Sequence, residues 1–474
     1  MPRTDTSSGT DLTAMTARDL AAAIRSRAVS PVEVTEAVLA RIEARADLNA
    51  FITVTAQEAR AEARAAEAMV MAADDPASLP PLLGVPYSVK DLTATRGVRT
   101  TMGSAIFADN LPAEDAVAVA RARAAGAILI GKTTTPEFGH KQAADAPIFG
   151  RTLNPIDPTV TCGASSSGAA VAVAAGMGPI ALGTDGGGSI RIPAACCGIV
   201  GLKATLGRIP HLALPDLFSA NSFVGPMARD VADTRLLFDA ISGLDARDPW
   251  GQGALPAERR VTTLEGLKVA YLPRCGTRVD PRVLAATDAV VARMAQAGAH
   301  VHEIEIDFAA EERHFLVVLQ SGLAARIGPH LARFRDRMDP SLVMTIEKGM
   351  AHSAVDLQAA AAARTAIFTR IQAELSRADV IISPTLTAPP LPVDQDPNGI
   401  VTIAGEPVGT IRGAWYPYTF PLNLTGHPAL SMPGGTTPGD HLPIGLQIIG
   451  RWHDDRFILD VAGLVETLNG GDAG

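Results

Sequence analysis

Two serine-rich stretches, Gly163-Ala164-Ser165-Ser166-Ser167-Gly168 and Gly183-Thr184-Asp185-Gly186-Gly187-Gly188-Ser189-Ile190-Arg191, decide the fold prediction for this chain. Small residues at 168–175 follow the first stretch and predict a closely packed helix. The apolar run at 179–182 leads into the second stretch and predicts a buried strand. Strand and helix patterns alternate in this way from 80 to 210, which indicates an α/β fold with helices on the faces of a sheet.

The second stretch places a candidate nucleophile beside a flexible backbone. Three successive glycines, Gly186, Gly187 and Gly188, allow a tight turn in which several N–H groups point into one concavity. Such a concavity stabilises the oxyanion of a tetrahedral intermediate, an effect worth about 3–4 kcal/mol for one donor. Ser189 follows directly, where an acylated residue would stand. On these residues alone, a plain turn or a phosphate-binding loop is an equal alternative.

The candidate base is Lys90, one of only six lysines, at the end of an apolar strand expected over 85–89. The simplest explanation of such a lysine is a surface residue paired with Asp91. If the amine is instead buried without a carboxylate partner, its pKa falls below the usual value of about 10.4, and it can accept a proton. A lysine with two serine clusters, neither of which contains a histidine, indicates acyl transfer from an amide or ester.

The first serine cluster also has a structural explanation. Ser166 and Ser167 stand where residues that cap the helix after Gly168 are expected. This explanation is weaker for Ser165, which precedes them.

These motifs together resemble those of the amidase signature hydrolases, over nearly the whole chain. The resemblance implies a single large domain over 1–474, with a mixed central sheet covered by helices on both faces. The motifs are densest between 82 and 210. They are Leu83-Gly84-Val85-Pro86, Lys90-Asp91, Gly131-Lys132-Thr133, Glu137-Phe138, Asn154-Pro155, the two serine stretches and Gly201-Leu202-Lys203, with further matches at Gly225-Pro226-Met227-Ala228-Arg229, Ser383-Pro384-Thr385 and Gly426-His427-Pro428.

The resemblance also implies roles for individual residues. Ser189 would be the nucleophile, Lys90 the base, and a serine on a cis peptide bond the bridge between them. Ser165 stands 24 positions before Ser189, the spacing that the resemblance implies for the bridge. The backbone N–H groups of Gly186, Gly187 and Gly188 would form the oxyanion hole. The chain departs from the family pattern at Ala164 and Ser167, which replace glycines, and at Gly186, a position that is often bulkier.

Two other catalytic patterns are excluded by their local sequence. The P-loop pattern is met literally by Gly126-Ala127-Ile128-Leu129-Ile130-Gly131-Lys132-Thr133. Its four middle residues are typical of a buried strand, not of a phosphate-binding loop, and Pro136 interrupts the helix that should follow. A nucleophile elbow, Gly-x-Ser-x-Gly, is not formed around Ser165, because Ser167 stands where the last glycine is needed.

Outside 82–210 the sequence carries fewer motifs, so the elements expected there are assigned from hydrophobic pattern and composition. Helices are expected over 1–75, over 226–243 and through most of 309–378, and a long surface loop over 388–409. We expect the helices and loops within 309–420 to build the substrate pocket, with the loop at 388–409 a candidate lid. Asp185 and Arg191 are interpreted as a structural ion pair or loop anchor.

The expected substrate is a small, aryl or alkyl amide cleaved through a Ser189 acyl-enzyme, without cofactor or metal. A carbamate or ester fits the same chemistry. The A subunit of a glutamyl-tRNA amidotransferase complex is the other alternative, because the family includes it. The net charge of -9 argues against nucleic-acid or anionic-membrane partners, and a homodimer is left open. Four cysteines without metal-ligand spacing favour reduced thiols in a cytoplasmic protein.

Overall fold

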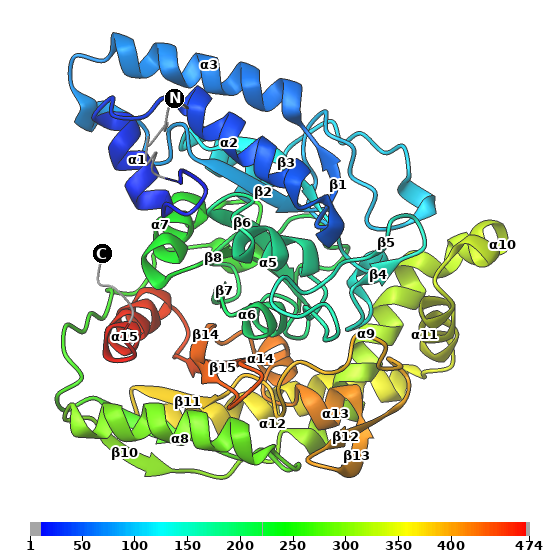
Figure 1. Cartoon of the computed structure of the whole chain (residues 1–474). Coiled ribbons are helices and arrows are strands. Elements are labelled where there is room, and N and C mark those ends of the chain that lie inside the picture. The colour runs from blue at the N-terminus through cyan, green and yellow to red at the C-terminus, as the bar shows by residue number, and fades with distance from the viewer. Residues whose placement is uncertain (1–10, 220, 471–474) are drawn as a thin grey trace.

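An eleven-stranded sheet runs through residues 11–219 and 221–470, the part of the chain that the computed structural model describes (Figure 1). Its strands are β1 (Phe51–Val54), β2 (Pro86–Lys90), β3 (Ile128–Thr133), β6 (Ile180–Asp185), β7 (Val200–Lys203), β8 (Phe223–Ala228), β9 (Lys268–Tyr271), β10 (His300–Glu303), β11 (Val380–Pro384), β14 (Ala429–Thr436) and β15 (Pro443–Ile449). Their order in the sheet is β1-β3-β2-β6-β8-β7-β14-β15-β11-β9-β10. β2 pairs in parallel with β3 and β6, whereas β8 is antiparallel to β6 and β7. The predicted mixed α/β sheet is therefore confirmed.

Helices cover both faces of this sheet. The helices of the described chain are α1 (Ala17–Arg25), α2 (Pro31–Ala44), α3 (Ala56–Ala72), α4 (Val117–Ala124), α5 (Ser167–Ala174), α6 (Arg191–Cys197), α7 (Val231–Ile241), α8 (Pro281–Gln296), α9 (Glu312–Ile327), α10 (Leu331–Phe334), α11 (Pro340–Met350), α12 (Ala354–Leu375), α13 (Ile411–Trp415), α14 (Phe420–Thr425) and α15 (Asp455–Leu468). Of these, α11 packs on α9. Figure 1 shows α2 and α3 near β3, α1 beside α7, and α8 beside β10 at the opposite end of the sheet.

Local sequence explains where the early helices begin. Ser30 caps α2 and forms a capping box with Glu33, and Pro31 occupies the first helical turn. Thr16 caps α1 by accepting the N–H of Asp19 at 3.0 Å. The helices expected within 1–75 and 309–378 are present over the described residues, but strand β1 interrupts the first of these ranges because it pairs with β3.

Strand pairing brings the motif-bearing segments to one edge of the sheet. β2 ends at Lys90, and its parallel neighbour β6 ends at Asp185, directly before the glycine run. Val89 lies opposite Leu182 in this pair, so the carboxyl ends of the two strands lie side by side. Loops at the carboxyl ends of neighbouring parallel strands are where α/β folds build their sites. Lys90 and the second serine stretch therefore meet at this edge.

Two expected elements are wrong. The helix expected over 226–243 is strand β8 followed by α7, because residues 223–228 pair with β6 over its whole length. The loop expected over 388–409 contains a hairpin of β12 (Ile400–Ile403) and β13 (Glu406–Thr410). Its turn uses Ala404 and Gly405, both with positive φ. One further two-stranded ribbon joins β4 (Asp145–Ala146) and β5 (Gly150–Arg151).

One helical stretch, Ala309–Arg337, is long and apolar enough by composition to span a membrane. Within it α9 has 16 residues, and short 3-10 segments precede and follow that helix. At 1.5 Å per residue α9 is about 24 Å long, which is shorter than a hydrocarbon core of about 30 Å. The stretch is a set of short helices in the described chain, and it contacts α11 and α12.

Candidate active site

Lys90 is completely buried, and hydroxyl and carbonyl oxygens surround its amine. Its Nζ lies 2.8 Å from Ser165 Oγ, 3.0 Å from Ser166 Oγ and 3.2 Å from the Thr184 carbonyl oxygen. The alternative of a surface lysine paired with Asp91 is wrong. The Asp91 carboxylate lies instead 3.7 Å from the buried Lys132 amine.

Burial lowers the pKa of the Lys90 amine well below its usual value, while the more distant Asp185 carboxylate acts in the opposite direction. No carboxylate of the described residues forms an ion pair with this amine. Desolvation therefore dominates, and it favours the uncharged form of the amine, which is the form that can accept a proton.

The neighbouring hydrogen bonds distinguish Ser165 from Ser166. The Ser166 hydroxyl donates its proton to the Thr184 carbonyl at 3.0 Å and accepts the Thr184 N–H at 3.1 Å. Its oxygen can therefore only accept from Lys90. An uncharged amine has two N–H donors, which Ser166 Oγ and the Thr184 carbonyl accept, and one lone pair. In that form the lone pair would accept the Ser165 hydroxyl proton, whereas a charged amine would donate to Ser165 Oγ instead.

The two serine clusters are also joined through the backbone. The Ser166 N–H donates to the Ser189 carbonyl at 3.0 Å, and both serines are buried. The Ala164–Ser165 peptide bond is cis, as the resemblance implied for the bridging serine. Gly139, with φ of 69°, passes so close that an added methyl group would meet Ser165 Oγ at 2.9 Å. The turn at 137–139 therefore forms one wall beside Ser165.

The oxyanion-hole prediction changes at one position. The Gly188 N–H donates to Asp185 Oδ1 at 2.6 Å, so this group is already engaged. Within the described chain, the N–H groups of Gly186, Gly187 and Ser189 donate to no protein acceptor. The available donors are therefore Gly186, Gly187 and Ser189, and Gly188 supplies the turn, with φ of 124°.

A buried polar network holds this loop from behind. The Asp185 carboxylate pairs with Arg191 at 3.0 Å and also accepts the Ile190 N–H and the Asn423 side-chain amide. Arg191 donates in turn to Asn423 and Gln447, at 2.7 and 2.8 Å. Burial alone would raise the pKa of Asp185, but Arg191 holds it well below its usual value. The predicted structural ion pair is confirmed.

Sequence reasoning did not find the aromatic residue that covers the loop. A methyl group added to Gly187 would meet the Phe315 ring at 2.6 Å, and Phe315 packs against Phe420 with ring centroids 5.1 Å apart. Thr419 donates its hydroxyl proton to the Gly187 carbonyl at 2.8 Å. Phe315, Thr419 and Phe420 all lie within 309–420, where the substrate pocket is expected, but nothing in the sequence singles out Phe315 as the ring that lies against the loop.

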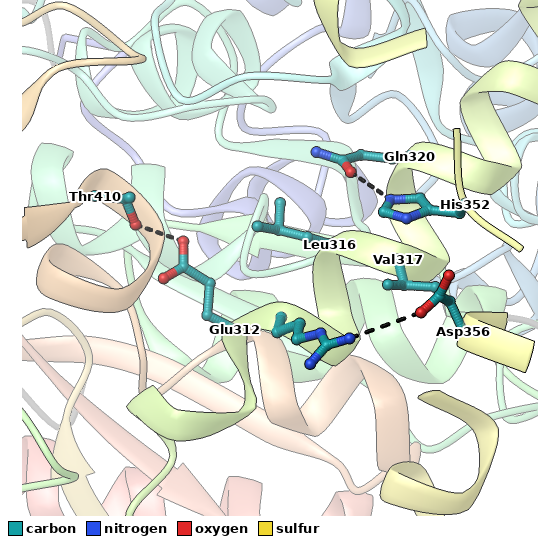
Figure 2. A pocket seen from close by; sticks show the side chains of 8 residues that line it. Glu312, Leu316, Val317, Gln320, His352, Asp356 and Thr410 are labelled. Carbon is teal, nitrogen blue, oxygen red and sulfur yellow. Dashed lines mark hydrogen bonds and ion pairs between the residues drawn. The ribbon is translucent and has the colours of Figure 1, made fainter. Parts of the chain in front are cut away.

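A separate surface pocket of about 360 Å³ lies along α9 (Figure 2). Its polar side chains are paired with one another: Gln320 with His352 at 2.7 Å, Arg313 with Asp356 at 3.7 Å, and Glu312 with Thr410. None of the predicted catalytic residues lines it. Its lining residues are Glu312, Arg313, Leu316, Val317, Gln320, His352, Asp356 and Thr410.

The potential metal ligands of the described chain are dispersed. Over residues 11–219 and 221–470, no group of three or more His, Cys, Asp or Glu side chains is arranged to hold a metal ion. The four cysteines are buried free thiols.

Comparison with known proteins finds relatives along nearly the whole chain. A model of the family Amidase matches residues 33–459. The acylamidase of Rhodococcus erythropolis is 34% identical over 466 residues, which cover 96% of this chain and 95% of that protein. The A subunit of the glutamyl-tRNA(Gln) amidotransferase of Roseiflexus sp. (strain RS-1) is also 34% identical, over 94% of this chain and 95% of that protein.

Solved structures give the same picture. A bacterial aryl acylamidase of the amidase signature family superposes with a TM-score of 0.87, at 27% identity over 96% of each chain. A peptide amidase from Stenotrophomonas maltophilia superposes with a TM-score of 0.79, at 25% identity over 96% of each chain.

Fold and comparisons together define a hydrolase of the α/β class that acts on amides. The chain belongs to the amidase signature family, and the resemblance found in its sequence is confirmed.

Proposed function

We propose that this chain is a stand-alone amidase that cleaves small, aryl or alkyl amides through Ser189, Ser165 and Lys90. The observation that carries the proposal is the arrangement around Lys90. Its amine is buried and pairs with no carboxylate of the described residues, and its Nζ lies 2.8 Å from Ser165 Oγ, whereas the Ser166 proton is engaged by the Thr184 carbonyl. In the proposed relay, the Ser165 hydroxyl passes a proton between the Lys90 amine and the Ser189 hydroxyl in either direction.

The proposed reaction proceeds in two halves. Ser165 gives its proton to the Lys90 amine while it takes the Ser189 proton, and Ser189 Oγ bonds to the substrate carbonyl carbon. The N–H groups of Gly186, Gly187 and Ser189 hold the oxyanion. When the C–N bond breaks, Lys90 returns its proton through Ser165 to the leaving amine. Water then attacks the acyl-enzyme by the same relay, releasing the acid and restoring Ser189.

The proposed substrate class rests on similarity and on the walls of the site. An acylamidase and an aryl acylamidase are among the relatives, and Phe315 and Phe420 give the site an apolar wall. A carbamate or an ester would react by the same steps. The substrate partner is thus a small molecule, and we retain a cytoplasmic location as a proposal.

Similarity to the A subunits of amidotransferases supports a second candidate, catalysis inside a complex. The net charge of -9 does not favour contact with tRNA. Purified chain that hydrolyses a simple amide without added proteins supports the stand-alone enzyme. Activity that requires further proteins supports the complex.

The nucleophile is tested by covalent labelling. Wild-type protein should turn over acetanilide and gain the mass of an organophosphonate probe, and Ser189→Ala should do neither. Ser376→Ala, an exposed residue at the end of α12, is the matched control and should behave as the wild type. Labelling retained in Ser189→Ala refutes the assignment.

A further inference from the structure

Of the three glycines in the loop, only Gly186 faces open space in the direction that a side chain would take. Gly186 is half-buried, and in the direction that a side chain would take from it no heavy atom of the described residues lies within 4 Å. The same direction is blocked at Gly187 by Phe315, and at Gly188 by Thr419 and Ile192. Substrate therefore has room to approach the loop beside Gly186.

Nothing in the backbone requires glycine at this position. Gly188 has a positive φ of 124°, whereas Gly186 is not among the described glycines in the left-handed region. A larger residue would therefore fit without backbone strain or collision. The absence of a side chain at Gly186 has one clear consequence, which is open volume on the same loop as the proposed nucleophile Ser189.

An aromatic ring lies one residue along the loop from Gly186. The Phe315 ring lies against Gly187, one residue along the loop, and packs on Phe420 with an interplanar angle of 31°. Both rings are buried, at 2% and 0% exposure. Aromatic rings pair favourably with another ring in tilted or offset geometry.

We propose that Gly186 determines substrate specificity: its missing side chain leaves space in which an aromatic ring of the amide substrate lies beside the oxyanion loop, next to Phe315. This inference rests on the proposed function and narrows its substrate class to amides with an aryl substituent next to the scissile bond.

The test compares three amides that differ in where a ring is attached: acetamide, acetanilide and benzamide. For Gly186→Ala and Gly186→Val, kcat/KM for at least one aromatic amide should fall relative to that for acetamide, by at least about tenfold with valine. The amide that is most affected identifies the side of the scissile bond that the space receives. Gly463→Val is the matched control, because Gly463 lies on α15 without positive φ and the nearest atom to an added side chain is Val231 Cγ1 at 4.0 Å; this variant should leave all three rates unchanged.

The outcomes separate this inference from the proposed function. A wild-type protein that hydrolyses none of the amides refutes the proposed function, and the inference falls with it. If the wild type hydrolyses them but the Gly186 variants slow acetamide and aromatic amides equally, or slow neither, the specificity role is wrong. If Gly186→Val melts well below the wild type, the position is crowded and the inference is also overturned. The melting temperature of Gly186→Ala tests the same conclusion with a smaller side chain.

Discussion

The Ser166 hydroxyl donates to the Thr184 carbonyl at 3.0 Å, and this bond leaves Ser166 without a proton to give to Lys90. Three adjacent serines made the bridging residue ambiguous in sequence. A hydrogen bond to strand β6 holds Ser166 in a structural role, which supports Ser165 as the proposed bridge.

Replacing the two serines should separate these roles. Ser165→Ala removes the proposed relay, so kcat should fall by about 10²–10⁴-fold, the usual contribution of general acid–base catalysis. Ser166→Ala removes the two bonds to Thr184 and should cost about 1–2 kcal/mol of unfolding free energy, with a smaller effect on kcat. Steady-state kinetics and urea unfolding measure both effects. A larger loss of kcat in Ser166→Ala would reverse the assignment.

The same substitution should destabilise the protein far less at the buried Lys90 than at the buried Lys132. Lys90 has no ion-pair partner among the described residues, so Lys90→Met, of similar volume, should change stability by less than about 1.5 kcal/mol while abolishing the proton relay. Lys132→Met leaves the buried Asp91 carboxylate unpaired and should cost about 3–5 kcal/mol. Thermal melts and kcat, measured on both variants, make the comparison. Equal destabilisation by both would indicate that Lys90 is a charged structural residue.

The loop anchor Asp185 should be needed for stability and catalysis together. Asp185→Asn removes the charge that pairs with Arg191 and weakens the bond to the Gly188 N–H, so unfolding free energy should fall by about 3–5 kcal/mol. A misplaced glycine loop should also slow acylation of Ser189 at temperatures where the variant is folded. Denaturant unfolding and the rate of phosphonate labelling are the measurements. Unchanged stability would show that the network does not hold the loop.

A carboxylate cluster far from the site should make stability depend on pH. Burial, with the charge of Asp230 adding to it, raises the pKa of Asp233 to about 6, and burial raises that of Glu466 to about 7. The folded protein then keeps protons that the unfolded chain releases, so these groups lower the unfolding free energy as pH rises from about 4 to about 7.

Asp233→Asn cannot titrate and should flatten this dependence between about pH 4 and about pH 6. The Asp233 carboxylate also accepts the N–H groups of Ala17 and Arg18 at the start of α1, so the variant should lose about 1 kcal/mol overall. Melting temperatures at several pH values test this, and a slope identical to that of the wild type would contradict it.

Short-range sequence patterns predicted the structure correctly where residues close in the chain determine it. The strand that ends at Lys90, the strand that ends at Asp185 and the capping box at Ser30 all follow from short-range patterns, and each is present. The engagement of Gly188 by Asp185 is also local, because an aspartate can accept a backbone N–H a few residues ahead, and this signal was missed.

Contacts between distant segments could not be predicted in this way. Phe315 reaches Gly187, and Asn423 reaches Asp185, only because tertiary packing fixes how α9 and α14 lie against the loop. Residues 226–228 lie in a strand because β6 offers partners along its whole length, which outweighs the local helix preference.

The protonation state of Lys90 is the central claim, and NMR of the lysine side chains measures it directly. With six lysines in the chain, uniform ¹³C,¹⁵N-lysine labelling gives few Cε–Nζ signals, and Lys90→Met identifies one of them. We predict that at pH 7 this signal has the shift of a free amine and moves to that of an ammonium only at lower pH. An ammonium signal for Lys90 that persists above pH 9 would contradict the mechanism.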